Sequence, residues 1–253
     1  MQKIFVLLVF CFSGIAVGAH AQWLNYRDPK APRTADGKPN LKAPAPKLPE
    51  GTPDFTGIWG APNGKYLDNL GADGIEVPMQ PWAEQLYKER VANNAKDRPS
   101  GRCLPHSVTD LDAHFTPRKI VQTPGLMLML YESSHVYRQI FTDGRALPED
   151  RDPAWWGYSV GKWEGDTLVV DTVGLNEKTW LDDSGHPHTD ALHIIERFRR
   201  LDFGHMEVQL TIDDPKAYKK AWTARIPWDL MPDTDILDWV CENEKDTSHL
   251  SGK

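Results

Sequence analysis

Cysteine is scarce in this chain of 253 residues, with only Cys11, Cys103 and Cys241 present. Cys11 lies in the N-terminal apolar run, which leaves two cysteines far apart in sequence. In an oxidising compartment this pattern favours a disulfide between Cys103 and Cys241, with two separate buried thiols as the alternative.

Positive charge is also in deficit, since 29 Lys and Arg face 36 Asp and Glu, for a net charge of -7. An acidic chain with scattered Lys and Arg lacks the footprint expected for nucleic acid or an anionic membrane surface. Glycine-rich phosphate-binding loops and dinucleotide fingerprints are absent. Beyond the N-terminal run, no segment is apolar for long enough to cross a bilayer. A neutral or weakly charged small molecule is therefore the expected partner.

A Gly-x-Ser-x-Gly nucleophile elbow is missing as well. Ser133, Ser134 and Ser159 lie in predicted strands or turns, and no neighbour in the sequence would activate them. We therefore expect chemistry that does not use a serine nucleophile.

The N-terminus has the pattern of a secretory signal peptide. Lys3 precedes an apolar run over 4–18, and Ala-His-Ala at 19–21 matches a cleavage signal. We expect residues 1–21 to be removed and the mature protein to be periplasmic or secreted.

Residues 22–53 are expected to form an arm, and 54–253 a single domain. Seven prolines lie between 28 and 53 with almost nothing that could fill a core, which favours an extended segment of polyproline character. Such an arm could pack on its own domain or on a partner in an oligomer. A disordered leader is the alternative.

The domain is predicted to be mainly β. Short runs of β-formers separated by turns indicate an antiparallel meander. A first strand is predicted over 55–59. From residue 119 onward the pattern becomes β, with predicted strands over 125–133, 135–142, 158–163, 167–172, 192–201, 206–213 and 221–228. Alternation in 206–213 predicts one packed and one wet face. Closure removes the sheet edges, so we expect a lipocalin-like or curled barrel.

One convincing helix is predicted, from Pro81 to about Asn93, with proline at its first position. Trp82, Leu86 and Tyr87 share a face, so this helix is expected to cover a sheet. Residues 99–117 are expected to form a long irregular loop, and such loops are often functional.

Several motifs resemble a large family of secreted bacterial proteins, known chiefly as hypothetical proteins. The resemblance covers most of the mature chain and is most specific at the Trp-Glu-Gly-Asp-Thr-Leu turn of 163–168 and the Leu-His-x-x-Glu-Arg-Phe strand of 192–198. It implies a calycin-like or lipocalin-like β-barrel. It implies no particular catalytic residues.

A histidine cluster is the predicted catalytic centre. Imidazole beside carboxylates suits acid–base catalysis near neutral pH. The candidate catalytic residues are His186, His188, Asp190, His193, Glu196 and Arg197. We expect the first three on a loop at the barrel mouth. On the strand that follows, His193 and Arg197 share one face and Glu196 lies on the other, so either face brings a polar group inward. A purely structural ion pair of Glu196 stays open.

The same histidines allow a metal site as an alternative. His186 and His188 would project to the same side of an extended backbone, and His193, Asp190 or a distant His106 or His114 would complete the set. Since the stereotyped second half of a zinc motif is absent, we predict no cofactor. A metal ion held by His186, His188 and His193 is the alternative. A simple turn that caps a strand end is another.

Ten tryptophans supply the hint about the substrate. We expect Trp155, Trp156 and Trp180 to line the pocket together with His106 and His114. The favoured function is an exported lyase or hydrolase that acts by acid–base chemistry on an aromatic or sugar-like compound. Ether cleavage in a lignin-type aryl ether is one concrete case. The alternatives are a non-catalytic periplasmic carrier of a hydrophobic molecule and a histidine-ligated metalloenzyme.

Overall fold

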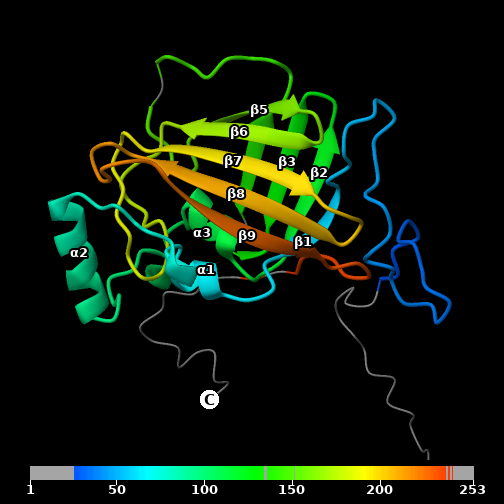
Figure 1. Cartoon of the computed structure of the whole chain (residues 1–253), viewed down its shortest axis with the longest axis horizontal. Coiled ribbons are helices and arrows are strands. Elements are labelled where there is room, and N and C mark those ends of the chain that lie inside the picture. Colours follow the sequence, from blue (N-terminus) through cyan, green and yellow to red (C-terminus); the bar gives the residue numbers. More distant parts are fainter. Residues whose placement is uncertain (1–25, 134–135, 151, 238, 240, 242–253) are drawn as a thin grey trace, which may run out of the picture.

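Nine strands form a closed barrel, so the predicted mainly β barrel is confirmed (Figure 1). The computed structural model describes residues 26–133, 136–150, 152–237, 239 and 241; the predicted signal peptide, Cys11 and Ser134 lie outside these residues. The strands are β1 (Gly57–Gly60), β2 (Arg118–Thr123), β3 (Leu126–Tyr131), β4 (Val136–Phe141), β5 (Tyr158–Glu164), β6 (Thr167–Val173), β7 (His193–Arg200), β8 (His205–Asp213) and β9 (Trp222–Leu230).

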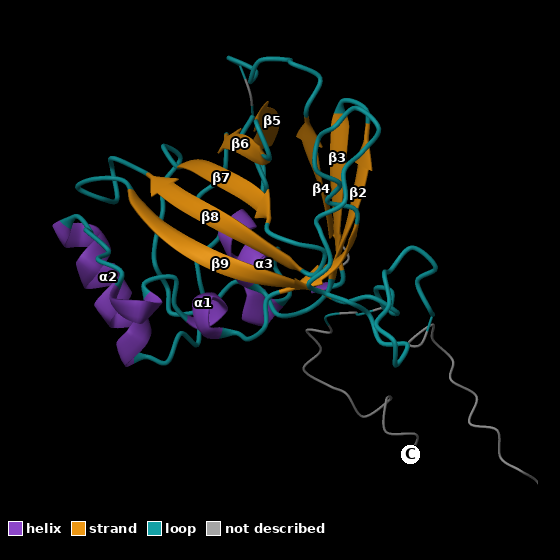
Figure 2. Cartoon of the chain, turned by 45° about the vertical axis from the view of Figure 1, so that its right-hand side comes forward, coloured by secondary structure: helices purple, strands orange, loops and turns teal. Residues whose placement is uncertain are grey.

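The barrel departs from the predicted antiparallel meander at one place, because β4 and β5 run parallel. The reason is geometric. In a closed ring of nine strands, direction cannot alternate at every step, so at least one neighbouring pair must be parallel. The connection 142–157 crosses over to make this pair, as a parallel connection requires. Figure 2 shows β2–β4 and β5–β9 as two walls on either side of this junction.

Alternating side chains decide what lies inside the barrel. Along β8 every second residue is buried, which confirms the predicted packed face. Along β7 the buried positions are Ile194, Glu196, Phe198 and Arg200. Of the two faces that the sequence left open, the one with Glu196 therefore points into the barrel.

The predicted helix is present as α2 (Pro81–Ala92), but it covers a loop and not a sheet. The ring of Tyr87 stacks on that of His186, with 4.3 Å between ring centroids. Arg90 Nη1 donates to the Gly185 carbonyl oxygen at 2.9 Å. Trp82 is 44% exposed, and its indole donates to the Lys216 carbonyl oxygen at 2.9 Å. No helix among the described residues is long and apolar enough to span a bilayer.

The prediction of an irregular loop over 99–117 is wrong, because it contains a buried helix, α3 (Val108–Ala113). Ser107 begins this helix by accepting a hydrogen bond from the backbone N–H of Asp110 at 3.0 Å. The helix lies at one end of the barrel, beside the short α1 (Lys65–Asp68) (Figure 2). Arg118 of β2 and Trp228 of β9 both donate to the Asp112 carbonyl oxygen, at 2.8 and 2.7 Å. The barrel wall thus holds the end of α3 in place.

The N-terminal arm is folded against the barrel and is not a single extended run. Isolated bridges pair Arg33 with Pro39 and Lys47 with Pro53, which closes two turns. The backbone of the β7–β8 turn donates to Leu41 and Ala43 of the arm. Proline has no backbone N–H to donate but keeps its carbonyl oxygen, and these turns use proline carbonyl oxygens as hydrogen-bond acceptors. A role of the arm in oligomer formation stays a prediction.

Cys103 and Cys241 form the predicted disulfide, with their Cα atoms 5.5 Å apart. The bond ties the segment before α3 to the chain beyond β9.

Candidate functional site

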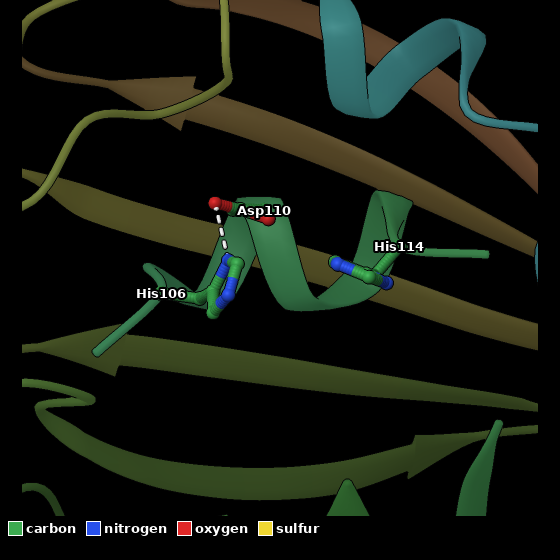
Figure 3. A group of neighbouring side chains, drawn as sticks. All are labelled: His106, Asp110 and His114. Atoms are coloured by element: carbon green, nitrogen blue, oxygen red, sulfur yellow. Dashed lines mark hydrogen bonds and ion pairs between the residues drawn. The ribbon is translucent and has the colours of Figure 1, made fainter. Parts of the chain in front are cut away.

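A buried histidine–aspartate pair lies at the N-terminal end of α3 (Figure 3). His106 Nδ1 and Asp110 Oδ2 are 2.8 Å apart, and both side chains are less than a tenth exposed. Burial alone would lower the pKa of His106, but the hydrogen bond and charge of Asp110 outweigh it, so the pKa is raised. A carboxylate that binds Nδ1–H fixes the tautomer and leaves Nε2 to exchange protons.

Ser133 is the polar neighbour of that free nitrogen. Its Oγ lies 3.4 Å from His106 Nε2, and the residue is 2% exposed. Ser133 lies two residues beyond the end of β3, on which Met129 and Tyr131 are also buried. Ser133 has no activating neighbour in the sequence, but His106 lies beside it in the fold. The two residues are far apart in sequence, and the docking of α3 brings them together.

His114 approaches the same place from the other end of α3, and Figure 3 shows its ring directed towards His106. The ring centroids of the two histidines are 5.3 Å apart. The Thr116 backbone N–H donates to His114 Nδ1 at 3.1 Å. In the neutral imidazole the proton therefore sits on Nε2, which makes it a hydrogen-bond donor. Phe115 stacks on His114 and is 55% exposed, so an aromatic surface borders this part of the site.

His106, Asp110 and His114 are also the group that most resembles a metal site in the part of the chain described. One ligand atom from each lies within 4.8 Å of the others. Metal-bound histidine normally donates its second ring N–H to a partner. His114 instead accepts a hydrogen bond at Nδ1, so ligation through Nε2 would require breaking its contacts with Thr116. The present arrangement suits proton transfer better than metal binding.

The burial of His114 leads to a pH-dependent prediction. Burial, followed by the positive charges of His106 and Arg118, lowers the pKa of His114 to about 3. The unfolded chain binds a proton here near the usual value of about 6.5, so this residue destabilises the fold as pH falls from 6.5 towards 3. We expect the unfolding free energy of His114→Gln, relative to the unmodified protein, to rise between pH 7 and pH 4. Urea denaturation at several pH values measures this difference, and a constant difference would contradict the prediction.

The predicted catalytic histidines of the 186–193 segment are not brought together. His186 is buried, and its Nδ1 lies 2.5 Å from Asp182 Oδ2. Asp182 also accepts from the Leu70 backbone N–H at 2.8 Å and from the Gly185 backbone N–H at 3.0 Å. Burial opposes ionisation of Asp182, but the hydrogen bond and charge of the His186 ring, with the backbone N–H groups of Leu70 and His186, lower its pKa. The pair ties the loop to the segment after α1, and the ring of His186 is buried in this contact.

The remaining predicted residues occupy separate surfaces. His188 is buried with both ring nitrogens in contact, Nε2 with Thr179 Oγ1 at 2.8 Å and Nδ1 with the Thr189 carbonyl at 3.2 Å. Burial lowers its pKa. Three others lie on outward or exposed positions in ion pairs: His193 with Asp171, Arg197 with Glu164, and Asp190 with Lys216. These pairs point away from the barrel interior.

Glu196 is the predicted residue that does lie inside the barrel. Arg138 Nη1 donates to Glu196 Oε1 at 2.6 Å, and its Nη2 donates to Thr172 Oγ1 at 2.7 Å. Ser159 Oγ accepts from Arg138 Nε at 3.2 Å. The carboxylate is thus fully paired, which matches the structural alternative that the sequence left open.

Asp112 of α3 faces this ion pair, but no hydrogen-bond donor contacts its carboxyl group among the described residues. Neither carboxylate oxygen has a hydrogen-bond partner among the described residues, and Arg118 Nε lacks one as well. Burial, with the negative charge of Glu196 added, raises the pKa of Asp112 well above its usual range. Both effects favour the protonated form of the Asp112 carboxyl group.

Of the tryptophans expected to line a pocket, two lie near His106 and one does not. The Trp156 indole donates to the His106 carbonyl oxygen at 3.0 Å and so helps to fix the base. Trp180 borders a cavity of about 10 Å³ beside His106 and Asp110, which is room for a single water, so a larger substrate has to displace surrounding side chains to reach this base. Its ring also lies under Arg90, 4.1 Å from the guanidinium carbon. Trp155 lies apart, with Lys178 5.8 Å from its ring centroid.

A larger groove, of about 440 Å³, lies between the arm and the barrel. Its lining combines apolar residues such as Ile58, Phe203 and Leu230 with charged ones such as Lys119 and Arg200, and it contains no histidine. Its size falls in the range of small-molecule sites. It suits binding better than proton transfer.

No protein-family model, curated protein or solved structure matches the chain. The resemblance to secreted bacterial proteins therefore stays a prediction. Functional conclusions rest on the geometry of the site alone.

Proposed function

We propose that this protein is an exported enzyme, a lyase or hydrolase of an aromatic small molecule, with His106 as its general base. The hydrogen bond from His106 Nδ1 to Asp110 Oδ2 carries the proposal, because it presents a basic Nε2 in a largely buried setting. The base thus moves from the predicted 186–193 segment to α3. The disulfide supports an oxidising location outside the cytoplasm.

The aromatic surroundings support the substrate class. Phe115 and Trp156 lie next to the two histidines, and flat apolar faces suit aromatic ligands. Aryl esters and lignin-type aryl ethers are therefore the first substrates to test, followed by aryl glycosides.

The test is a kinetic comparison of variants on 4-nitrophenyl esters, a β-aryl ether and 4-nitrophenyl glycosides. We expect turnover of at least one class, and a loss of about 10²- to 10⁴-fold in kcat for His106→Gln, as removal of a general base gives. Asp110→Asn should lower kcat less, because the imidazole remains but its tautomer is no longer fixed.

His205→Gln is the matched control. His205 Nδ1 also binds an aspartate, Asp202, at 2.7 Å, but it lies at the half-exposed start of β8. This variant should keep full turnover. Equal rates for His106→Gln and the unmodified protein, or no turnover of any class, would contradict the proposal. Loss of turnover on metal removal from protein made without a histidine tag would assign the chemistry to a metal instead.

The carrier function is the second candidate, and the 440 Å³ groove favours it. Under this alternative, a fluorescent apolar probe such as 1-anilinonaphthalene-8-sulfonate binds stoichiometrically. Phe203→Asp then abolishes binding while His106→Gln leaves it unchanged.

A further inference from the structure

We infer that Ser133 is a nucleophile and that the site hydrolyses carboxylic esters through an acyl-enzyme. This inference rests on the proposed function, since it uses His106 as the base. The inference is based on two consecutive contacts. Asp110 Oδ2 lies 2.8 Å from His106 Nδ1, and His106 Nε2 lies 3.4 Å from Ser133 Oγ. A nucleophile within reach of a base that a third group orients is the arrangement of covalent hydrolases on unrelated folds.

The direction of the hydrogen bonds fits this assignment. Asp110 Oδ2 has to accept the Nδ1 proton of neutral His106, which leaves the Nε2 lone pair facing Ser133. The hydroxyl then donates to Nε2, as proton removal from Oγ requires. The Nε2–Oγ distance is longer than an ideal hydrogen bond, and such contacts are commonly loose before substrate binds.

His114 supplies the second element that acyl transfer needs. Thr116 holds its Nδ1 as an acceptor through the backbone N–H at 3.1 Å, so the Nε2–H is available as a neutral donor. Its ring is directed towards that of His106 (Figure 3). A fixed neutral donor near the carbonyl stabilises the oxyanion that forms during attack.

The reaction balances with water as the co-reactant. Ser133 Oγ attacks the ester carbonyl carbon while its proton passes to His106 Nε2. The bond to the alcohol oxygen breaks, and His106 returns the proton to that leaving oxygen. Water then attacks the acyl-enzyme as His106 takes its proton, the acid leaves, and the proton returns to Ser133 Oγ.

The experiment labels the full-length protein with a fluorophosphonate, which reacts with activated serines. We expect one label per chain, mapped by peptide mass spectrometry to Ser133, and none in Ser133→Ala. His106→Gln should slow labelling by at least 100-fold, in line with loss of a general base. Ser184→Ala is the matched control, because Ser184 Oγ also lies 3.3 Å from a histidine nitrogen, in His186, but donates to Asp182.

The outcomes separate the inference from the function on which it rests. If Ser133→Ala keeps 4-nitrophenyl acetate turnover while His106→Gln loses it, the nucleophile is wrong and the general base stands. If neither change affects turnover, both are wrong. Label on a serine other than Ser133 also overturns the inference. Thermal unfolding of each variant shows whether a loss reflects chemistry, and Ser133→Cys, which keeps a nucleophile of similar size, should keep measurable acylation.

Discussion

Replacing Arg138 by Met is expected to lower the free energy of unfolding by about 3–5 kcal/mol, the usual cost of breaking a buried ion pair from one side. Arg138 and Glu196 have side-chain exposures of 2% and 0%, so the remaining carboxylate would be unpaired inside the barrel. Urea denaturation at pH 7 measures the effect.

Arg197→Met provides the matched control on β7. Arg197 Nη2 pairs with Glu164 Oε2 at 2.8 Å on the outer face, where the side chains are 38% and 53% exposed. Its loss should change stability by about 0–1 kcal/mol. The double variant Arg138→Met with Glu196→Leu should recover much of the loss, since neither charge remains. Equal costs at Arg138 and Arg197 would contradict the prediction.

Reducing the Cys103–Cys241 disulfide is expected to lower the free energy of unfolding by about 5 kcal/mol, from the chain entropy of a loop this long. The two cysteines are 138 residues apart. A whole domain is typically stable by about 5–15 kcal/mol, so the reduced protein should be close to unfolding at 37 °C. Because Cys103 lies three residues before His106, turnover should fall as well.

Chemical denaturation with and without dithiothreitol measures this effect. The variant Cys103→Ser with Cys241→Ser is the control, because it should match the reduced protein and show no response to reductant. A shift below about 1 kcal/mol would mean that the reduced chain retains enough structure to offset the entropy.

The barrel could be predicted from the sequence because the patterns that indicate its strands and turns lie within short segments. Alternation in 206–213 and the short turns between strands indicate a meander whatever the rest of the chain does. The parallel pairing of β4 with β5 could not be predicted in this way. It depends on the number of strands in the closed ring, which no single segment specifies.

The candidate site was harder to predict because it forms only when α3 packs against the barrel. His106, Asp110 and His114 are spaced by four residues, which places them on one side of a helix, but surrounding prolines and glycines favoured a loop. Ser107 ahead of Asp110 was the available signal for a helix start. The contact of Ser133 with His106 depends on where α3 lies, which no local pattern specifies.

The parallel junction between β4 and β5 is a weakly paired part of the barrel wall, called here the seam. Only two residue pairs join β4 to β5, Ile140 with Ser159 and Phe141 with Val160, whereas β7 and β8 share eight. Arg138 extends from β4 across this seam to Ser159 on β5, so the buried charges fasten two strands that the backbone joins weakly. The β1–β9 pairing is equally short, with two residue pairs, so these two junctions are where the wall is expected to open locally and to exchange its amide hydrogens first. Because α3 closes one end of the barrel, a ligand that passes through the wall would depend on how strongly Arg138 holds β4 to β5.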